Sequence, residues 1–246
     1  MTLATLEQQA QQFAADLTDT VKQLVPDCSP FHARTLTDSA AVKMAVRQEP
    51  DTGIPLMVSG EPLLTLKVSY SCCLDGHQRY LAVDESKVAV YAGAKAQREP
   101  LFRYEYVRRT APDLPSAHLQ LHAHRDAFTR VMGRAGESTP RGRRRARADA
   151  VPQLNELHFP LGGHRFRPCL EDVMEMLVTE FGVDSTAGQL RQLAVGRERW
   201  RRKQLRSVVR DAPREAVEVL RSLGYSVDWN LDDAEPEENV TRLRDF

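Results

Sequence analysis

The chain has 246 residues, of which 41% are hydrophobic, and its 34 basic and 34 acidic side chains give no formal net charge. This composition predicts a folded protein with a real core. No stretch approaches the roughly 20 apolar residues of a membrane span, and the N-terminus lacks the pattern of a secretory signal. The four cysteines form no CxxC pair, so we expect reduced thiols and a cytoplasmic protein without a membrane partner.

An amphipathic helix is expected near the N-terminus, within residues 3–25. Its apolar residues are spaced by three and four and end before Pro26: Leu6, Ala10, Phe13, Ala14, Leu17, Val21 and Leu24. From about residue 54 the period changes to two. The alternating run that contains Leu64, Leu66 and Val68 ends at Asp75-Gly76, which predicts a hairpin with its return strand at residues 78–83.

Further strands are expected at residues 88–92, 101–108 and 118–124. Phe102, Tyr104 and Tyr106 share one face of the second of these, and Arg103 and Glu105 share the other. Together the strands form an antiparallel meander of about five. A short helix at residues 126–132 and another short strand at residues 154–159 are also expected.

Residues 133–152 lack a core-forming pattern and are expected to form a disordered basic loop. Five arginines fall within seven residues there: Arg141, Arg143, Arg144, Arg145 and Arg147. Such a run would bind nucleic-acid phosphates without reading sequence, or an acidic partner.

The C-terminal part of the chain reads as helical. Pro168 opens a helix that ends at Gly182, and residues 186–210 predict a strongly basic helix with Arg197, Arg199 and Arg201 among its cations. A last helix starts near Asp211 and Pro213 and stops at Gly224. The acidic tail at residues 228–238 would neutralise the basic helix, either within the molecule, which we favour, or in a neighbouring subunit. A homo-oligomer is therefore compatible with the sequence.

These elements predict an α+β fold, in which an antiparallel sheet of five to six strands packs against helices and a helical extension follows. The expected parts are residues 1–132 (helix and meander), 133–152 (basic loop), 153–183 (strand and helix that complete the domain) and 184–246 (helical extension with an acidic tail).

Three of the seven histidines fall on alternate positions of one expected strand. His118, His122 and His124 would share a face with Gln120, backed by an apolar face with Leu119 and Leu121. Imidazole transfers protons near neutral pH and is also a common metal ligand. The alternative is a solvated strand face whose histidines hydrogen-bond to Glu105 or Asp126.

A metal site at this row would need a further ligand. His158, His164 or a carboxylate could complete a set of three, but no recognised ligand spacing is present, so we expect no metal and no other cofactor.

An anion site is a second candidate, at the turn before the Pro168 helix. Gly162 and Gly163 allow a phosphate to approach the backbone closely, and His164, Arg165 and Arg167 follow. The helix N-terminus would supply free N–H groups. An ordinary strand-to-helix turn is the alternative.

Taken in order, Phe102-Arg-Tyr-Glu-Tyr, the Ala111-Pro-Asp-Leu-Pro link, the histidine strand and the Pro168-Cys-Leu-Glu-Asp-Val helix resemble the TumE-type toxins of bacterial toxin–antitoxin modules, over residues 60–182. The resemblance implies a toxin-like protein that acts on RNA and pairs with an antitoxin or regulator protein. The longer N-terminal region, the basic insertion and the C-terminal extension depart from that pattern.

In the corresponding reaction, metal-independent RNA cleavage, one imidazole accepts the 2′-hydroxyl proton and another protonates the leaving oxygen. We expect His122 and His124 to be this pair, with His118 or His158 as alternates. Arg103 would stabilise negative charge, and Tyr104 or Tyr106 would stack on a base or donate a hydrogen bond. The alternative function is a non-enzymatic nucleic-acid-binding regulator or interaction protein.

Overall fold

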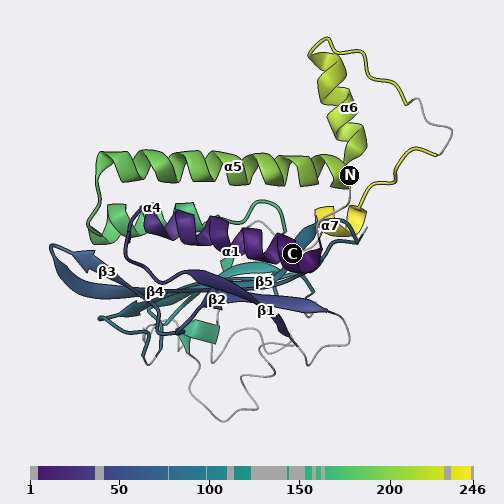
Figure 1. Ribbon diagram of the computed structural model, residues 1–246. Helices are drawn as coiled ribbons and strands as arrows, with labels where there is room; N and C mark the ends of the chain where they lie inside the picture. The colour runs from purple at the N-terminus through teal and green to yellow at the C-terminus, as the bar shows by residue number, and fades with distance from the viewer. Residues whose placement is uncertain are drawn as a thin grey trace.

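The computed structural model describes residues 5–36, 42–76, 78–97, 99–109, 114–122, 143, 153–156, 159–161, 164–229 and 234–244. An antiparallel sheet of eight strands carries helices on one of its faces (Figure 1). This arrangement confirms the expected α+β class. The sheet has more strands than the five to six that the sequence indicated.

The strands follow one another across the sheet almost in chain order. From one edge to the other they are β1 (Phe31–Leu36), β2 (Lys43–Gln48), β4 (Glu61–Leu74), β5 (Leu81–Ala92), β6 (Phe102–Val107), β7 (Ala117–Leu121) and β8 (Phe159–Pro160). The remaining strand, β3 (Ile54–Val58), pairs with β4 beside this path.

The hairpin of β4 and β5 is the centre of the sheet, and its turn falls where Asp75-Gly76 predicts it. The Asp75 carboxylate accepts hydrogen bonds from the backbone N–H groups of Arg79 and Tyr80, at 2.8 and 3.2 Å. These bonds fix the turn and with it the register of both strands. The return strand is longer than expected, because the strands expected at residues 78–83 and 88–92 form one continuous strand.

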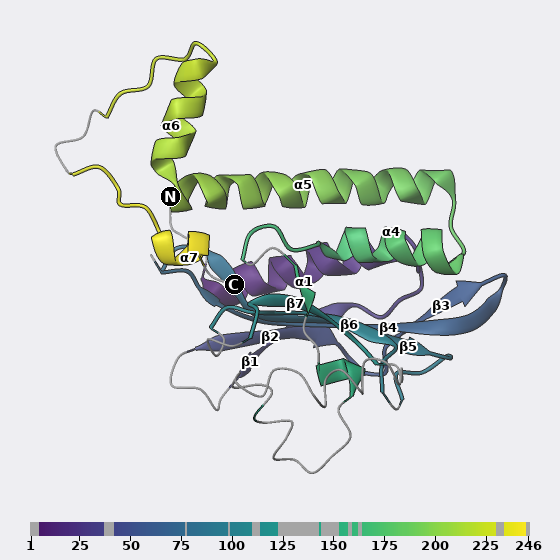
Figure 2. The same cartoon turned by 180° about the vertical axis from the view of Figure 1, so that it is seen from behind.

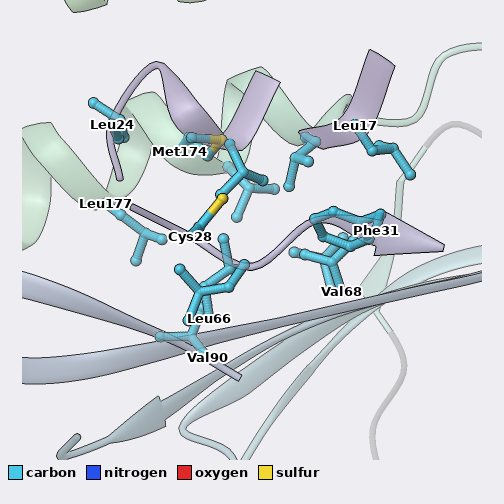
Figure 3. Close-up of a cluster of buried hydrophobic side chains, with 14 of the residues drawn as sticks. Leu17, Leu24, Cys28, Phe31, Leu66, Val68, Val90, Met174 and Leu177 are labelled. Atoms are coloured by element: carbon cyan, nitrogen blue, oxygen red, sulfur yellow. The ribbon is translucent and has the colours of Figure 1, made fainter. Parts of the chain in front are cut away.

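Helices α1 (Leu6–Lys22) and α4 (Leu170–Phe181) cover one face of the sheet. Thr5 and Gln8 form a capping box at the start of α1, which satisfies two N–H groups that the first turn leaves without partners. The buried stripes of the two helices meet the central strands in the main core (Figure 3). Leu17, Met174 and Leu177 lie there above Leu66 and Val90. Each fully buried aliphatic side chain contributes about 1.5–3 kcal/mol to this packing.

Helix α5 (Ala187–Asp211) lies outside the layer of α1 and α4, so that three layers are stacked (Figures 1 and 2). Leu193 and Gly196 are its buried contacts with that layer. Helix α6 (Pro213–Ser222) projects from the end of α5, and the short α7 (Val240–Arg244) returns to the sheet near the start of α1.

Some local expectations were wrong. Strands β1, β2 and β3 were not foreseen, and the single strand expected at residues 154–159 is a 3-10 turn, η1 (Leu154–Glu156), followed by the two residues of β8. The expected helix at 126–132 and nearly all of the basic loop at 133–152 lie outside the described residues. None of the helices in the described ranges combines the length and the apolar composition that a membrane-spanning helix needs.

Candidate functional site

A row of polar side chains crosses the sheet on the face opposite α1 and α4. Strand register places Arg47, Ser69, Lys87, Glu105 and His118 directly opposite one another on β2, β4, β5, β6 and β7. Register partners share a face of the sheet. Arg47 is exposed, whereas His118 at the other end of the row is only 1% exposed. The solvated strand face that was the alternative interpretation of the histidine row therefore does not hold for His118, which is buried.

Both ring nitrogens of His118 face acceptors. Nε2 lies 3.2 Å from Oε2 of Glu105, and Nδ1 lies 3.0 Å from the carbonyl oxygen of Pro115. The second carboxylate oxygen of Glu105 lies 3.3 Å from Nε of Arg103 and 3.6 Å from Nζ of Lys87. The alternative in which a strand histidine hydrogen-bonds to Glu105 is thus the one observed for His118. Such an imidazole fastens β6 to β7 and has no open nitrogen to offer a substrate.

Arg103 connects this pair to a second histidine. Its Nε donates to Oε1 of Gln120, whose amide donates to the carbonyl oxygen of Asn155 at 3.0 Å. The Asn155 side-chain nitrogen lies 3.4 Å from Nδ1 of His122. The described residues thus bring three of the expected site residues, Arg103, His118 and His122, into one polar network at the β6–β7 edge.

His122 differs from His118 in that one of its ring nitrogens has no hydrogen-bond partner among the described residues. Its side chain is 7% exposed, and Nδ1 also lies 3.8 Å from a carboxylate oxygen of Glu99. Nε2 is buried and has no hydrogen-bond partner among the described residues. Burial, followed by the charge of Arg103, lowers the pKa of His122 below its ordinary value despite the opposing effect of Glu99. A neutral imidazole with one nitrogen held and the other open is the form that accepts a proton.

Tyr104 lies on the other side of the sheet from this network. It packs against the core below the helices, and its ring contacts Phe102 edge to face at 6.1 Å. Burial, then the charge of Asp172, raises the pKa of its hydroxyl. Because neighbouring residues on a strand point to opposite faces, Tyr104 cannot serve the same site as Arg103. Tyr106 shares the face of Tyr104 and contacts His164 instead.

Several expected site residues lie outside the described residues, so their roles in the histidine row, in the anion site before α4 and in the basic loop stay predictions. They are His124 and the alternate His158, the turn residues Gly162 and Gly163, and the loop residues Arg141, Arg144, Arg145 and Arg147. Arg143 is the described member of the arginine run.

The segment that precedes α4, residues 164–169, is held against the rest of the protein by hydrogen bonds of its polar side chains. His164 is 3% exposed, and its Nδ1 lies 2.9 Å from the hydroxyl of Tyr106. Arg165 binds the buried carboxylate of Asp211 through Nε at 2.6 Å and Nη2 at 3.2 Å. Arg167 donates to the carbonyl oxygen of His164 and lies over the Tyr106 ring. This segment joins the sheet to the far end of α5.

The N-terminus of α4, which the sequence suggested as part of an anion site, already has a carboxylate of its own first turn beside it. The helix begins at Leu170, and Oδ2 of Asp172 accepts a hydrogen bond from the N–H of Cys169 at 3.0 Å. Asp172 also binds Arg197 of α5, at 2.6 Å. The positive end of the helix is already occupied by a carboxylate of its own first turn. An anion at this segment would therefore depend on the arginines.

Most of the cationic side chains of α5 are exposed to solvent. Its exposed cations are Arg191, Arg199, Arg201, Arg202, Lys203, Arg206 and Arg210. The acidic tail does not neutralise them: among the described residues, no ion pair joins α5 to Asp228, Glu235, Glu237 or Glu238. The carboxylates that do pair with α5 come from α4, from α1 and from the helix itself. The expected pairing of helix and tail is thus wrong for the described residues.

Neither the thiols nor the carboxylates of the described ranges suggest other chemistry. Burial raises the pKa of Cys72 to about 12 and also raises those of Cys28 and Cys169, so these thiols are not activated nucleophiles. Within the same ranges, no group of three or more histidine, cysteine or carboxylate side chains is placed to hold a metal ion.

Sequence reasoning missed Asn155 and Glu99, which contact His122 from other parts of the chain. No motif or spacing marks them, because their roles depend on tertiary contacts with His122 across 33 and 23 residues of the chain. Comparison of the chain with protein-family models, with curated protein sequences and with solved structures finds no match. The resemblance to TumE-type toxins therefore stays a prediction from the sequence.

Proposed function

We propose that this protein binds nucleic acid through the outer face of α5, with RNA as the class that the sequence resemblance favours. One observation carries the proposal: the helix exposes a row of cationic side chains, and these outnumber the carboxylates that lie near them. Arg199, Arg202, Arg206 and Arg210 are spaced by three and four residues and so lie along one face, over about 16 Å of helix. A line of guanidinium groups on a rigid helix suits a phosphate backbone.

The exposed cations of α5 form few ion pairs, and these pairs are too weak to compete with a bound phosphate backbone. Arg202 pairs with Glu198 at 2.7 Å, but both side chains are more than 60% exposed. Lys203 lies 3.9 Å from Asp16, and Arg201 lies 3.6 Å from Asp172. Exposed pairs of this kind are worth at most about 1 kcal/mol. Arg199 and Arg206 form no ion pair with any described residue.

Salt-dependent binding of a single-stranded RNA tests this proposal. The variant in which Arg199, Arg202 and Arg206 are all replaced by Gln should bind more weakly at every salt concentration. Its slope of log K against log salt should fall by about 2, since each lost phosphate contact contributes about 0.7 for single strands. The charge-matched control replaces three exposed arginines elsewhere, Arg47, Arg214 and Arg244. An unchanged slope in the α5 variant, or an equal loss in the control, would refute the proposal.

RNA cleavage by His122 is a second candidate function, and it is favoured by the Nε2 atom, which has no hydrogen-bond partner among the described residues. Because this atom is buried, the residues that cover it would have to move for RNA to reach it. In this proposal His122 accepts the proton of the 2′-hydroxyl as the 2′-oxygen bonds to phosphorus, and Arg103 stabilises the negative charge that develops on the phosphoryl oxygens. The bond from phosphorus to the 5′-oxygen breaks as water protonates that oxygen, and the resulting hydroxide takes the proton back from His122. His118, tied to Glu105, is not the partner acid.

The two candidates are separated by one pair of variants. His122→Ala should abolish cleavage of RNA and leave the affinity for RNA unchanged, whereas the α5 variant should lose affinity. His32→Ala, an exposed histidine on β1, is the matched control. If cleavage persists in the His122 variant, or never appears in the intact protein, the catalytic proposal fails and the binding proposal stands by itself.

A further inference from the structure

Arg167 lies over the ring of Tyr106, close to where the short helix α7 reaches the sheet, and three further arginines act electrostatically on it or on one another. Cζ of Arg167 lies 3.8 Å from the centre of the Tyr106 ring, a cation–π contact, and the ring itself is 4% exposed. Arg165 and Arg242 are close enough for their charges to act on Arg167, and Arg108 acts in turn on Arg242. These four residues, Arg108, Arg165, Arg167 and Arg242, are called the arginine cluster.

The cluster is held in place from both sides by Asp211, the last residue of α5. Its carboxylate binds Arg165 through two hydrogen bonds, at 2.6 and 3.2 Å. Its backbone carbonyl oxygen accepts the N–H of Asn239 at 2.8 Å, just before α7 begins. Asn239 also caps α7 by accepting the N–H of Arg242 at 3.2 Å. Arg165 and Arg242 thus share one anchor, although they come from the segment before α4 and from α7. Arg108 follows the end of β6, and Arg167 lies two residues after Arg165.

Positive charge in the cluster exceeds the negative charge around it. Asp211 is the carboxylate that binds there, and it is taken by Arg165. Among the described residues, neither Arg167 nor Arg242 forms an ion pair. Burial lowers the pKa of both guanidinium groups, and the neighbouring arginines lower it further. A guanidinium that loses water without gaining a counter-ion costs free energy, so a bound anion would stabilise the fold here.

We propose that the arginine cluster binds a phosphate group, supplied either by free phosphate or by the terminal phosphate of a nucleic acid. A terminal phosphate carries up to two negative charges and three oxygens that accept hydrogen bonds, which matches several converging guanidinium groups better than a single carboxylate or a halide does. The site is distinct from the outer face of α5. Its ligand would contact Arg242 and Arg167, the latter of which lies over the Tyr106 ring.

Thermal unfolding and calorimetric titration with inorganic phosphate test the site in the full chain. We expect phosphate to raise the Tm with a saturating dependence on its concentration, while sodium chloride at equal ionic strength does not. Arg242→Gln should weaken phosphate binding by at least about tenfold, the effect of losing one charge-assisted hydrogen bond. Arg244→Gln, an equal change of charge two residues further along α7, should leave it unchanged.

Two results would overturn this proposal: a chain whose Tm and heat of titration do not respond to phosphate, or an Arg242→Gln variant that binds phosphate as the unaltered chain does. The two sources of the phosphate are distinguished by competition with a short oligoribonucleotide. Stronger competition by the 5′-phosphorylated form than by the 5′-hydroxyl form identifies a nucleic-acid end as the ligand, and equal competition identifies free phosphate. The α5 variant should retain the response to phosphate, so failure of one proposal does not conceal failure of the other.

Discussion

Glu105 and His118 face each other across β6 and β7, with Oε2 of the carboxylate 3.2 Å from Nε2 of the imidazole. His118 is almost fully buried, and the Glu105 side chain is 20% exposed. Loss of Glu105 would remove the acceptor that faces Nε2 of the buried His118, which costs free energy. The pair therefore supports the edge of the sheet on which His122 depends.

Replacement of Glu105 by Gln should lower the free energy of unfolding by about 1–3 kcal/mol near pH 7. Burial raises the pKa of Glu105, but the hydrogen bond from His118 and the charges of Arg103 and Lys87 outweigh it, so the pKa lies below its ordinary value. A lowered carboxyl pKa stabilises the fold above the unfolded-state pKa, and this contribution is lost as the pH falls through the folded-state value. The difference between the two proteins should shrink below about pH 4.3.

Denaturant unfolding over pH 3 to 8 measures this difference. Glu85→Gln, an exposed carboxyl on the neighbouring strand, is the matched control and should change the unfolding free energy little. A difference for Glu105→Gln that stays constant across the whole range would contradict the assigned role of the carboxylate.

His122 should titrate below its ordinary pKa of 6.5, as measured by NMR of its ring protons. Burial favours the neutral imidazole, and the charge of Arg103 adds to this effect, so Arg103→Gln should move the pKa upward. The unfolded chain takes up the proton first as the pH falls from 6.5, and the contribution of His122 to stability is lost in that range. Arg34→Gln, an exposed arginine on β1, should not move the pKa. A value at or above 6.5 in the unaltered protein would count against this environment.

Gly196 lets α5 approach Glu171 of α4, and the two residues should show strong coupling. A Cβ atom at position 196 would lie 2.7 Å from Oε1 and 3.1 Å from Cγ of Glu171. Alanine in place of glycine in a helix interior usually raises the free energy of unfolding by about 0.5–1 kcal/mol. In the unaltered chain Gly196→Ala should not show this increase, because its Cβ atom would clash with Glu171. In a Glu171→Ala background the same substitution should be stabilising. A double-mutant cycle of unfolding free energies measures the coupling, and simple additivity would disprove the contact.

Asp184 should hold the tight turn between β3 and β4. Its carboxylate accepts the N–H groups of Ser59 and Gly60, both at 2.8 Å, and both turn residues have positive φ. This is the backbone conformation of a two-residue hairpin, in which the turn N–H groups lack partners in the strands. Asp184→Ala should lower the free energy of unfolding by about 1 kcal/mol. Asp27→Ala, an exposed carboxylate elsewhere, provides the control, and equal effects of the two would argue against the capping role.

Local patterns were sufficient for much of the fold. The stripe in α1, the Asp75-Gly76 turn and the Pro168 and Gly182 boundaries of α4 each report a backbone conformation that a few neighbouring residues decide. Strands β1 and β3 were missed for a related reason. β1 is an edge strand with four of its last five residues exposed. β3 alternates in burial, but its sequence is apolar throughout and contains Pro55, so the alternation of apolar and polar residues that marks a half-buried strand is missing.

The sequence by itself determined the α+β class, the basic face of α5 and the alternation that puts Arg103 and Tyr104 on opposite sides of the sheet, because these depend on the period of a helix or a strand. Only the tertiary structure decided which of those side chains can act. Strand register placed Glu105 against the buried His118, and Asp211 brought Arg165 and Arg242 together from segments more than 70 residues apart in the chain. Burial and charge pairing depend on neighbours in space, which the spacing of residues along a chain does not report.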